Sequence, residues 1–261
     1  MEILSFLITL ATLPVFLILI FVYNKDKNKE PLSLLLELFG FGILSVFLVY
    51  AISVGLEHFI PFLEKDVEIM NFTEILIYSF IIVALVEEFC NWIFVYKFGY
   101  KSKDYDEKYD IIDYSVFVSL GFAFLENLLY VIGDLSIGLG IVRGLLSVPA
   151  HACNAIFMGY FLSLANLYSK QDDKENAKKN IILSILIPTL LHGIFDFCLM
   201  SNIKIMIVVF FGFVIFLYTV SLKKLDEVAQ KSKIENKNKF CPNCGKIIQG
   251  NYCGNCGTKQ V

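Results

Sequence analysis

The amino-acid sequence predicts an all-α polytopic membrane protein of about seven transmembrane helices, followed by a small C-terminal module. Three observations lead to this fold class. Hydrophobic residues make up 57% of the 261-residue chain, and the mean hydropathy of +0.67 is well above that of a soluble domain. Seven apolar stretches reach the roughly 20 residues that a helix needs to cross the hydrocarbon core. Lysine and arginine occur in short blocks between these stretches, so no nucleic-acid-binding face is expected in the membrane domain.

The predicted membrane domain covers residues 1–222, and its expected spans lie at 3–23, 32–56, 72–96, 111–132, 138–168, 179–200 and 203–222. The first span follows an acidic residue, where a secretory signal would carry a basic one, and it is long enough to cross the bilayer. We therefore expect a retained helix. The fifth span contains Pro149 and is expected to be kinked or partly interfacial.

Basic residues alternate between the connections. The first, third and fifth connections and the start of the tail are rich in lysine, whereas the second, fourth and sixth connections hold at most one lysine each. Cytosolic loops keep an excess of lysine and arginine. The pattern therefore predicts a multi-pass protein of the cell membrane with its N-terminus outside and its C-terminus in the cytosol, which requires an odd number of spans.

The polar tail contains a compact cysteine motif. Residues 223–239 are charged and nearly free of aromatic residues, as is typical of a solvated linker or a short fraying helix. Residues 240–261 then carry two Cys-x-x-Cys pairs, each followed by glycine, formed by Cys241, Cys244, Cys253 and Cys256. Two such pairs at this spacing predict a structural zinc ribbon with four thiolate ligands.

Two disulfides or a redox motif are the alternatives to the ribbon, and a reducing cytosolic compartment disfavours both. A module of this size has little core, so the metal is expected to supply its folding energy. No coordination position would remain open for catalysis. The ribbon is expected to contact a cytosolic protein.

Ionisable side chains within the spans are the main functional signal. Each charge near the bilayer centre costs at least about 2.5–3.5 kcal/mol, so each requires a reason. Counting about 1.5 Å per residue from the connections places these residues within roughly 10 Å of the midplane. The set consists of Glu87, Glu88, Glu126, Asn127, His151, His192 and Asp196.

Each residue of this set also has a structural explanation. A single histidine in a span more often joins helices than binds a ligand, and Asp196, one turn from His192, could serve only to orient it. The adjacent Glu87 and Glu88 point about 100° apart on a helix, so one of them could simply bond to a neighbouring span. Serine, threonine and glycine would hold a bundle together at a lower cost, however. The whole set therefore favours a polar, hydrated site. Arg143, near the outer end of the fifth span, is expected to snorkel or to pair with an acid.

Four ordered motifs of this set resemble those of a known family. They are Glu87-Glu88, then Phe122-x-x-x-Glu126-Asn127, then His151-Ala152 with Gly159, and finally His192-x-x-x-Asp196. Over roughly residues 30–200 this pattern resembles the PrsW family of bacterial intramembrane proteases, distant relatives of the CAAX prenyl endopeptidases and the bacteriocin-immunity membrane proteins. The ribbon is an addition to that shared core.

The resemblance implies an intramembrane peptidase that cuts single-span membrane proteins, such as an anti-sigma-factor-like regulator. Members of the family often carry a basic residue four places after the first glutamate of the pair, where this chain has Asn91.

Two mechanisms are compatible with the residues. In one, the Glu87-Glu88 pair supplies a general base, because burial and a neighbouring like charge raise the pKa of a carboxyl group, and His151 and His192 assist. In the other, the two histidines and Glu126 bind a second zinc ion, and a glutamate of the pair activates water. The chain lacks the His-Glu-x-x-His signature of common metalloproteases, which slightly favours the first mechanism.

Two other functional classes use the same residues differently. A proton-coupled transporter or channel would relay protons along these acids and histidines, although no inverted repeat supports it. A non-enzymatic receptor or scaffold would use them only to hold the bundle together, with the ribbon recruiting cytosolic proteins.

Overall fold

The computed structural model describes most of the chain as helices. The described residues are 2–26, 28–201, 203–237, 239–240, 243–244, 247–248 and 255–256. Six helices among them are long and apolar enough to cross a membrane, and they coincide with six of the seven expected spans. The remaining expected span, 72–96, lies in a helical run from residue 72 to residue 100, in which α- and π-helical turns alternate. The fold is therefore an all-α polytopic membrane protein.

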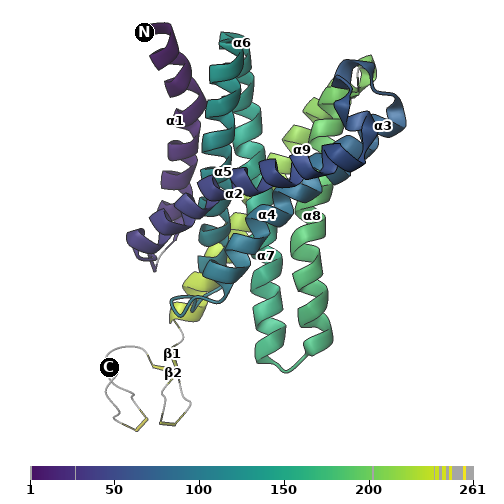
Figure 1. Cartoon of the computed structure of the whole chain (residues 1–261). Helices are drawn as coiled ribbons and strands as arrows, with labels where there is room; N and C mark the ends of the chain where they lie inside the picture. Colours follow the sequence, from purple (N-terminus) through teal and green to yellow (C-terminus); the bar gives the residue numbers. More distant parts are fainter. Residues whose placement is uncertain are drawn as a thin grey trace.

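The long helices are α1 (Glu2–Lys25), α2 (Leu32–Phe59), α5 (Asp110–Asp134), α7 (Val148–Lys170), α8 (Lys174–Met200) and α9 (Lys204–Lys237). The helical run 72–100 consists of α3 (Phe72–Ile77), η3 (Tyr78–Leu85), α4 (Val86–Phe94) and η4 (Val95–Tyr100). Two short 3-10 turns, η1 (Pro61–Glu64) and η2 (Val67–Ile69), precede it, and α6 (Ile137–Val142) and η5 (Arg143–Ser147) lead into α7. Figure 1 shows α5 and α7 in the middle of the bundle, with α2 lying obliquely across it.

Helix α5 is the central element of the bundle. It packs against α1, α2, α4 and α7, and its first fourteen residues are all buried. Glycines allow its crossing with α2, because a Cβ atom at Gly42 would lie 1.9 Å from the carbonyl oxygen of Val118 and one at Gly121 would lie 2.1 Å from that of Phe39. In contrast, α1, α2 and α9 present exposed large apolar side chains on their outer faces, as lipid-facing helices do.

Pro149 accounts for the π-helical segment η5. Proline has no N–H to donate, so the carbonyl of Leu145, four residues earlier, loses its helical partner. The hydroxyl group of Tyr218 in α9 donates to the carbonyl oxygens of Leu145 and Leu146, at 3.3 and 3.0 Å. The predicted irregularity of the fifth span is therefore a local widening of the helix that α9 compensates. This segment ends one helical turn before His151.

Helix α9 continues beyond the membrane domain into the charged tail. Residues up to Lys237 are helical, and Leu225 and Val228 are buried against the central helices. A short antiparallel pair follows, β1 (Lys239–Phe240) with β2 (Ile247–Ile248). Cys244 and Cys256 each lie in a turn. The other two expected zinc ligands, Cys241 and Cys253, lie outside the described residues.

Candidate active site

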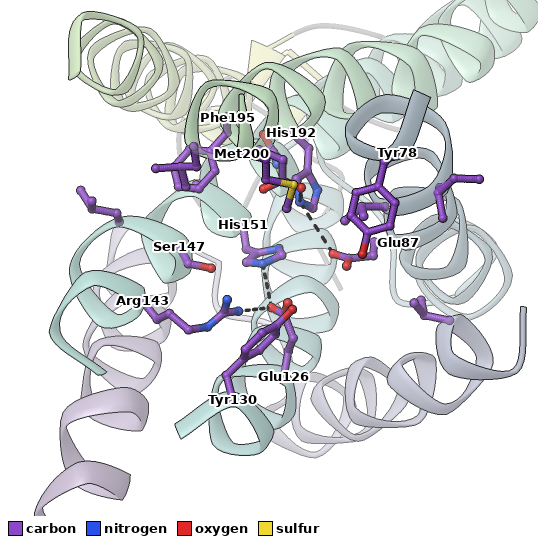
Figure 2. A pocket seen from close by; sticks show the side chains of 18 of the residues that line it. Tyr78, Glu87, Glu126, Tyr130, Arg143, Ser147, His151, His192, Phe195 and Met200 are labelled. Carbon is purple, nitrogen blue, oxygen red and sulfur yellow. Dashed lines mark hydrogen bonds and ion pairs between the residues drawn. The ribbon is translucent and has the colours of Figure 1, made fainter. Parts of the chain in front are cut away.

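The polar residues of the spans converge on one cavity of about 430 Å³. Helix α4 contributes Glu87, α5 contributes Glu126, α7 contributes His151, and α8 contributes His192 and Asp196. Figure 2 shows Glu87, Glu126, His151 and His192 pointing toward one another from four different helices. The cavity also extends along α2 to η1, where residues Glu57 and Leu63 line it.

The two adjacent glutamates differ in their surroundings. Glu87 lines the cavity, whereas Glu88 is 1% exposed and turns between α7 and α8. One oxygen of Glu88, Oε1, accepts a hydrogen bond from Asn154 Nδ2 at 3.1 Å and lies 2.9 Å from His192 Nδ1. With Nδ1 donating to Glu88, the other ring nitrogen of His192 faces Glu87 Oε2 at 3.7 Å. Glu88 therefore orients His192, and Glu87 faces the space where a substrate would lie.

Glu126 belongs to a charged group at the opposite wall. Its Oε2 lies 2.8 Å from Arg143 Nη2 and 3.2 Å from His151 Nε2. Arg143 also donates from Nε to Asn127 Oδ1 at 2.8 Å, and its guanidinium carbon lies 3.9 Å from the centre of the Tyr130 ring. The arginine thus pairs with an acid, which was one of its two expected roles. Asn127 contacts the arginine rather than the cavity.

Three side chains at the centre are close enough to share one metal ion. Glu87, His151 and His192 each offer a ligand atom, and the three atoms lie within 4.8 Å of one another. The zinc site expected from the sequence used the same two histidines with Glu126. In the structure, the acid that lies close to both histidines is Glu87. His151 and His192 have ring centroids 5.3 Å apart and nearly perpendicular planes. Two histidines and one glutamate are a common ligand set of catalytic zinc.

The charge balance of the cavity also fits a cation. Glu87, Glu126 and Asp196 line it, and Glu88 lies behind His192, whereas Arg143 is the one lysine or arginine among its lining residues. Within the described part of the chain, Glu87 Oε2 and His151 Nδ1 are buried without a hydrogen-bond partner. Buried acids and ring nitrogens in this arrangement are stabilised by a cation or by protons.

Sequence reasoning found the acids and histidines but not their supporting residues. Asn154 lies one helical turn after His151, and its amide would have been a reason to group it with the site. Asn91 lies where a basic residue was expected, and its Oδ1 accepts a hydrogen bond from the Ser45 hydroxyl at 2.7 Å. The cavity obtains its basic residue from Arg143 instead. No local sequence pattern identifies Arg143 as the partner of Glu126.

Comparison with known proteins identifies the family. The model of the PrsW family of intramembrane metalloproteases matches residues 30–222, most of the chain. The chain belongs to the PrsW family. It is 34% identical over 232 residues to protease PrsW of Clostridioides difficile, a match that covers 87% of this chain and 93% of the relative. It is 33% identical over 219 residues to protease PrsW of Bacillus subtilis, covering 84% and 93% of the two chains. No solved structure gives a significant match.

PrsW membership confirms the interpretation drawn from the four motifs. The protein is a multi-pass membrane protein and an intramembrane peptidase whose substrates are membrane proteins. The transporter and receptor alternatives have no support. The family description names a metalloprotease, which goes against the slight preference for a metal-independent mechanism. The donor set of Glu87, His151 and His192 fits such a metal.

Proposed function

We propose that the protein hydrolyses a peptide bond of single-span membrane proteins at the cavity between α4, α5, α7 and α8, with zinc held by Glu87, His151 and His192. The observation that carries the proposal is the convergence of these three ligand atoms within 4.8 Å of one another in a cavity large enough for a peptide segment. Zinc bound there would polarise the scissile carbonyl group and make a water molecule more acidic.

The remaining side chains support distinct parts of the reaction. Asp196 lies one turn from His192, with its Oδ2 3.4 Å from Nε2, and it lines the cavity. Its place beside His192 and at the cavity wall suits it to act as the general base. It would take a proton from the attacking water and return it to the leaving amine.

Arg143 and Glu126 would serve the oxyanion side of the site. A carboxylate held by arginine is a weak base, which favours a positioning role for Glu126 over a role in proton transfer. Glu126 fixes both Arg143 and His151 at the wall of the cavity. The guanidinium group of Arg143 would then face the negative charge that develops on the carbonyl oxygen.

The substrate is expected to enter from the side of the membrane opposite the basic connections. Glu57 and Leu63 line the cavity near the second connection, which the lysine distribution assigns to the outside. The same distribution supports an outside N-terminus and a cytosolic ribbon. Reporter fusions after residues 65, 105, 135, 174 and 202 should alternate in sidedness, starting outside. Two neighbouring fusions on the same side would contradict this topology.

The ribbon is proposed to be structural and dispensable for hydrolysis. The cysteine spacing and the turns at Cys244 and Cys256 support one zinc held by Cys241, Cys244, Cys253 and Cys256. A peptide of residues 237–261 should fold only when zinc is added, as NMR would show. A folded peptide in excess chelator would rule out the structural zinc. A cytosolic protein is the expected partner of the loaded ribbon.

The decisive test uses purified protein in liposomes with a panel of single-span substrates. A chain ending at residue 230, which lacks the ribbon, should retain cleavage and one zinc ion. His192→Ala in that background should lose both. A fully active chain without any tightly bound metal would overturn the zinc assignment and restore the glutamate-based mechanism. If neither the full-length chain nor the chain ending at residue 230 cuts any substrate of the panel, the proposed class of substrate is wrong.

A further inference from the structure

A second group of acidic side chains lies at the N-terminal end of α5, outside the active-site cavity. Asp26 follows α1, Glu107 precedes α5, and Asp110 begins it. One carboxylate oxygen of each lies within 4.8 Å of those of the other two. Asp110 and Glu126 are sixteen residues apart, about 24 Å along the helix. This acidic group is therefore separate from the proposed zinc site.

Hydrogen bonds fix the backbone around these carboxyl groups. Asp110 Oδ2 accepts from the N–H groups of Asp106 and Glu107, at 2.9 and 2.8 Å. Asp26 Oδ1 accepts from the N–H of Asn28 at 3.0 Å. Each of these two aspartates thus uses one oxygen to shape its own connection. These bonds hold both connections in place. Because Oδ2 of Asp110 is held, the direction of its Oδ1 is also fixed, and supporting hydrogen bonds orient metal ligands in the same way.

Two tyrosines, Tyr114 in the first turns of α5 and Tyr109 just before the helix, attach the α1–α2 connection to this end of α5. The Tyr109 hydroxyl donates to the carbonyl oxygen of Val22 at 3.1 Å. The Tyr114 hydroxyl donates to Glu30. Both tyrosine side chains are fully buried. The three acids are therefore brought together by packed structure and not by mobile surface loops.

Asp113 is a second, independent observation that points to a ligand at this end of α5. It lies one turn after Asp110 on the same face of α5 and is 0% exposed. Neither of its carboxylate oxygens has a hydrogen-bond partner within the part of the chain that the structure describes. The charged groups that act on it are Asp26, Asp110, Glu30 and, with the opposite sign, Lys29. Asp113 therefore lies beside Asp26 and Asp110, two members of the acidic group.

The nearby lysine does not bond to Asp113. Lys29 Nζ donates to the carbonyl oxygen of Tyr23 at 2.6 Å and to Asn24 Oδ1 at 3.3 Å. The N-terminus of α5 also attracts negative charge, but such an interaction contributes only a fraction of what burying a carboxylate costs. The partial positive charge at the helix N-terminus thus explains why acidic residues occur in the first turn of α5. It does not explain a buried aspartate without a partner.

We propose that Asp26, Glu107 and Asp110, with Asp113 beside them, form a binding site for a hard divalent cation, Mg²⁺ or Ca²⁺. All four residues offer carboxylate oxygens, which are the ligands these cations prefer, whereas zinc sites favour histidine and cysteine. The ion would join the α1–α2 connection to the connection that enters α5. It would stabilise the bundle on the face that carries the basic connections. The site is independent of the proteolytic reaction.

Thermal unfolding of the purified full-length protein in detergent tests this site. The protein is desalted without chelator so that bound zinc stays in place, and MgCl₂, CaCl₂ or KCl is added at equal ionic strength. We expect a saturable rise in Tm with Mg²⁺ or Ca²⁺, roughly 5–10 °C at a hundredfold excess over Kd, and none with K⁺. The relative response to the two divalent ions identifies the preferred cation.

Asp113→Asn is the main variant, because it keeps the shape of the side chain and removes one buried charge. It should fold at least as well as wild type without added metal and should bind Mg²⁺ or Ca²⁺ about 10- to 100-fold more weakly. Asp110→Asn should lose the response more fully. The matched control is Asp134→Asn at the exposed other end of α5, which should respond like wild type.

Two outcomes would overturn the proposal. One is a wild-type Tm that neither divalent cation changes, which would mean that these acids are held by protons. The other is an Asp113→Asn variant with an unchanged metal response. Both outcomes are measured as Tm and not as cleavage. The cation site can therefore be tested even if the proposed catalytic mechanism is wrong.

Discussion

The two ends of α5 both hold buried carboxyl groups, but their surroundings differ. Toward the C-terminal end, Glu126 pairs with Arg143 and His151 and lines the cavity of about 430 Å³. At the N-terminal end, Asp113 is buried without a hydrogen-bond partner among the described residues, and further acids surround it. The first end is provided with basic side chains from other helices. At the second end we propose that a divalent cation balances these acids.

The difference shows that the function of a buried acidic side chain has to be inferred from the groups around it. An acid paired with arginine and histidine beside a cavity is positioned for chemistry on a substrate. An acid among other acids, away from the cavity, is suited to a cation that holds connections together. A single helix can carry both because its middle part is a tightly packed spacer between α2 and α7.

Substitutions in the cavity should have the largest effect on cleavage. Glu87→Gln and Asp196→Asn are each expected to lower kcat by about 10²–10⁴-fold, because each removes a charge that faces the cavity. Tm should change little in Asp196→Asn and should fall in Glu87→Gln as bound zinc is lost. Glu87→Gln should also lower zinc content, whereas Asp196→Asn should not. Initial rates with a single-span substrate and metal analysis of the same samples measure both. Equal zinc loss in the two variants would contradict the division of roles between ligand and base.

Arg143→Gln should have the next largest effect, about 10- to 100-fold on kcat with KM nearly unchanged. Arg143→Lys is expected to restore little, because the arginine reaches Glu126 and Asn127 with different nitrogens. A double-mutant cycle with Glu126→Gln should be strongly non-additive. Additive losses would show that Arg143 and Glu126 act separately.

Gly121→Ala tests the spacer between the two ends. The added Cβ would lie 2.1 Å from the Phe39 carbonyl oxygen, so α2 must move away from α5. We expect a loss of about 1–3 kcal/mol of stability, measured as a lower Tm. Gly133→Ala is the matched control on the same helix, because nothing lies within 4 Å of its added Cβ. A similar Tm for both variants would contradict the close crossing.

The smallest effect is expected from substituting Glu30, which lies near the N-terminal end of α5, and it concerns the dependence of stability on pH. Burial raises the pKa of this carboxyl group above its ordinary value of 4.5. A raised pKa in the folded state means that the protonated form is favoured there, so stability is greatest at acidic pH and falls as the pH rises above 4.5. Glu30→Gln should flatten the dependence of Tm on pH in this window. An unchanged slope in the variant would show that another group is responsible.

The sequence predicted the helices, and it singled out most of the polar residues that line the cavity, because charges in apolar spans are conspicuous. It could not separate Glu87 from Glu88, since both occupy the same span and only the packing of α7 and α8 turns Glu88 toward Asn154. Arg143 was expected only to snorkel or to pair with an unspecified acid.

The acidic group was missed for a different reason. Asp26 and Glu107 lie in connections, where charged residues are common, and Asp110 and Asp113 begin a span, where acids favour a helix N-terminus. Their burial comes from contacts between segments more than eighty residues apart, such as Tyr109 with Val22 and Tyr114 with Glu30. No local pattern contains that information.

The burial of Leu225 and Val228 in α9 determines where the protein can be shortened. Both side chains pack into the central apolar cluster, and each contributes about 1.5–3 kcal/mol when fully buried. A chain cut at residue 222, where the apolar stretch ends in the sequence, would lose both. Inactivity of such a chain would report a damaged core and not a requirement for the ribbon. A shortened chain that keeps this core intact should therefore end after Val228, within the charged tail.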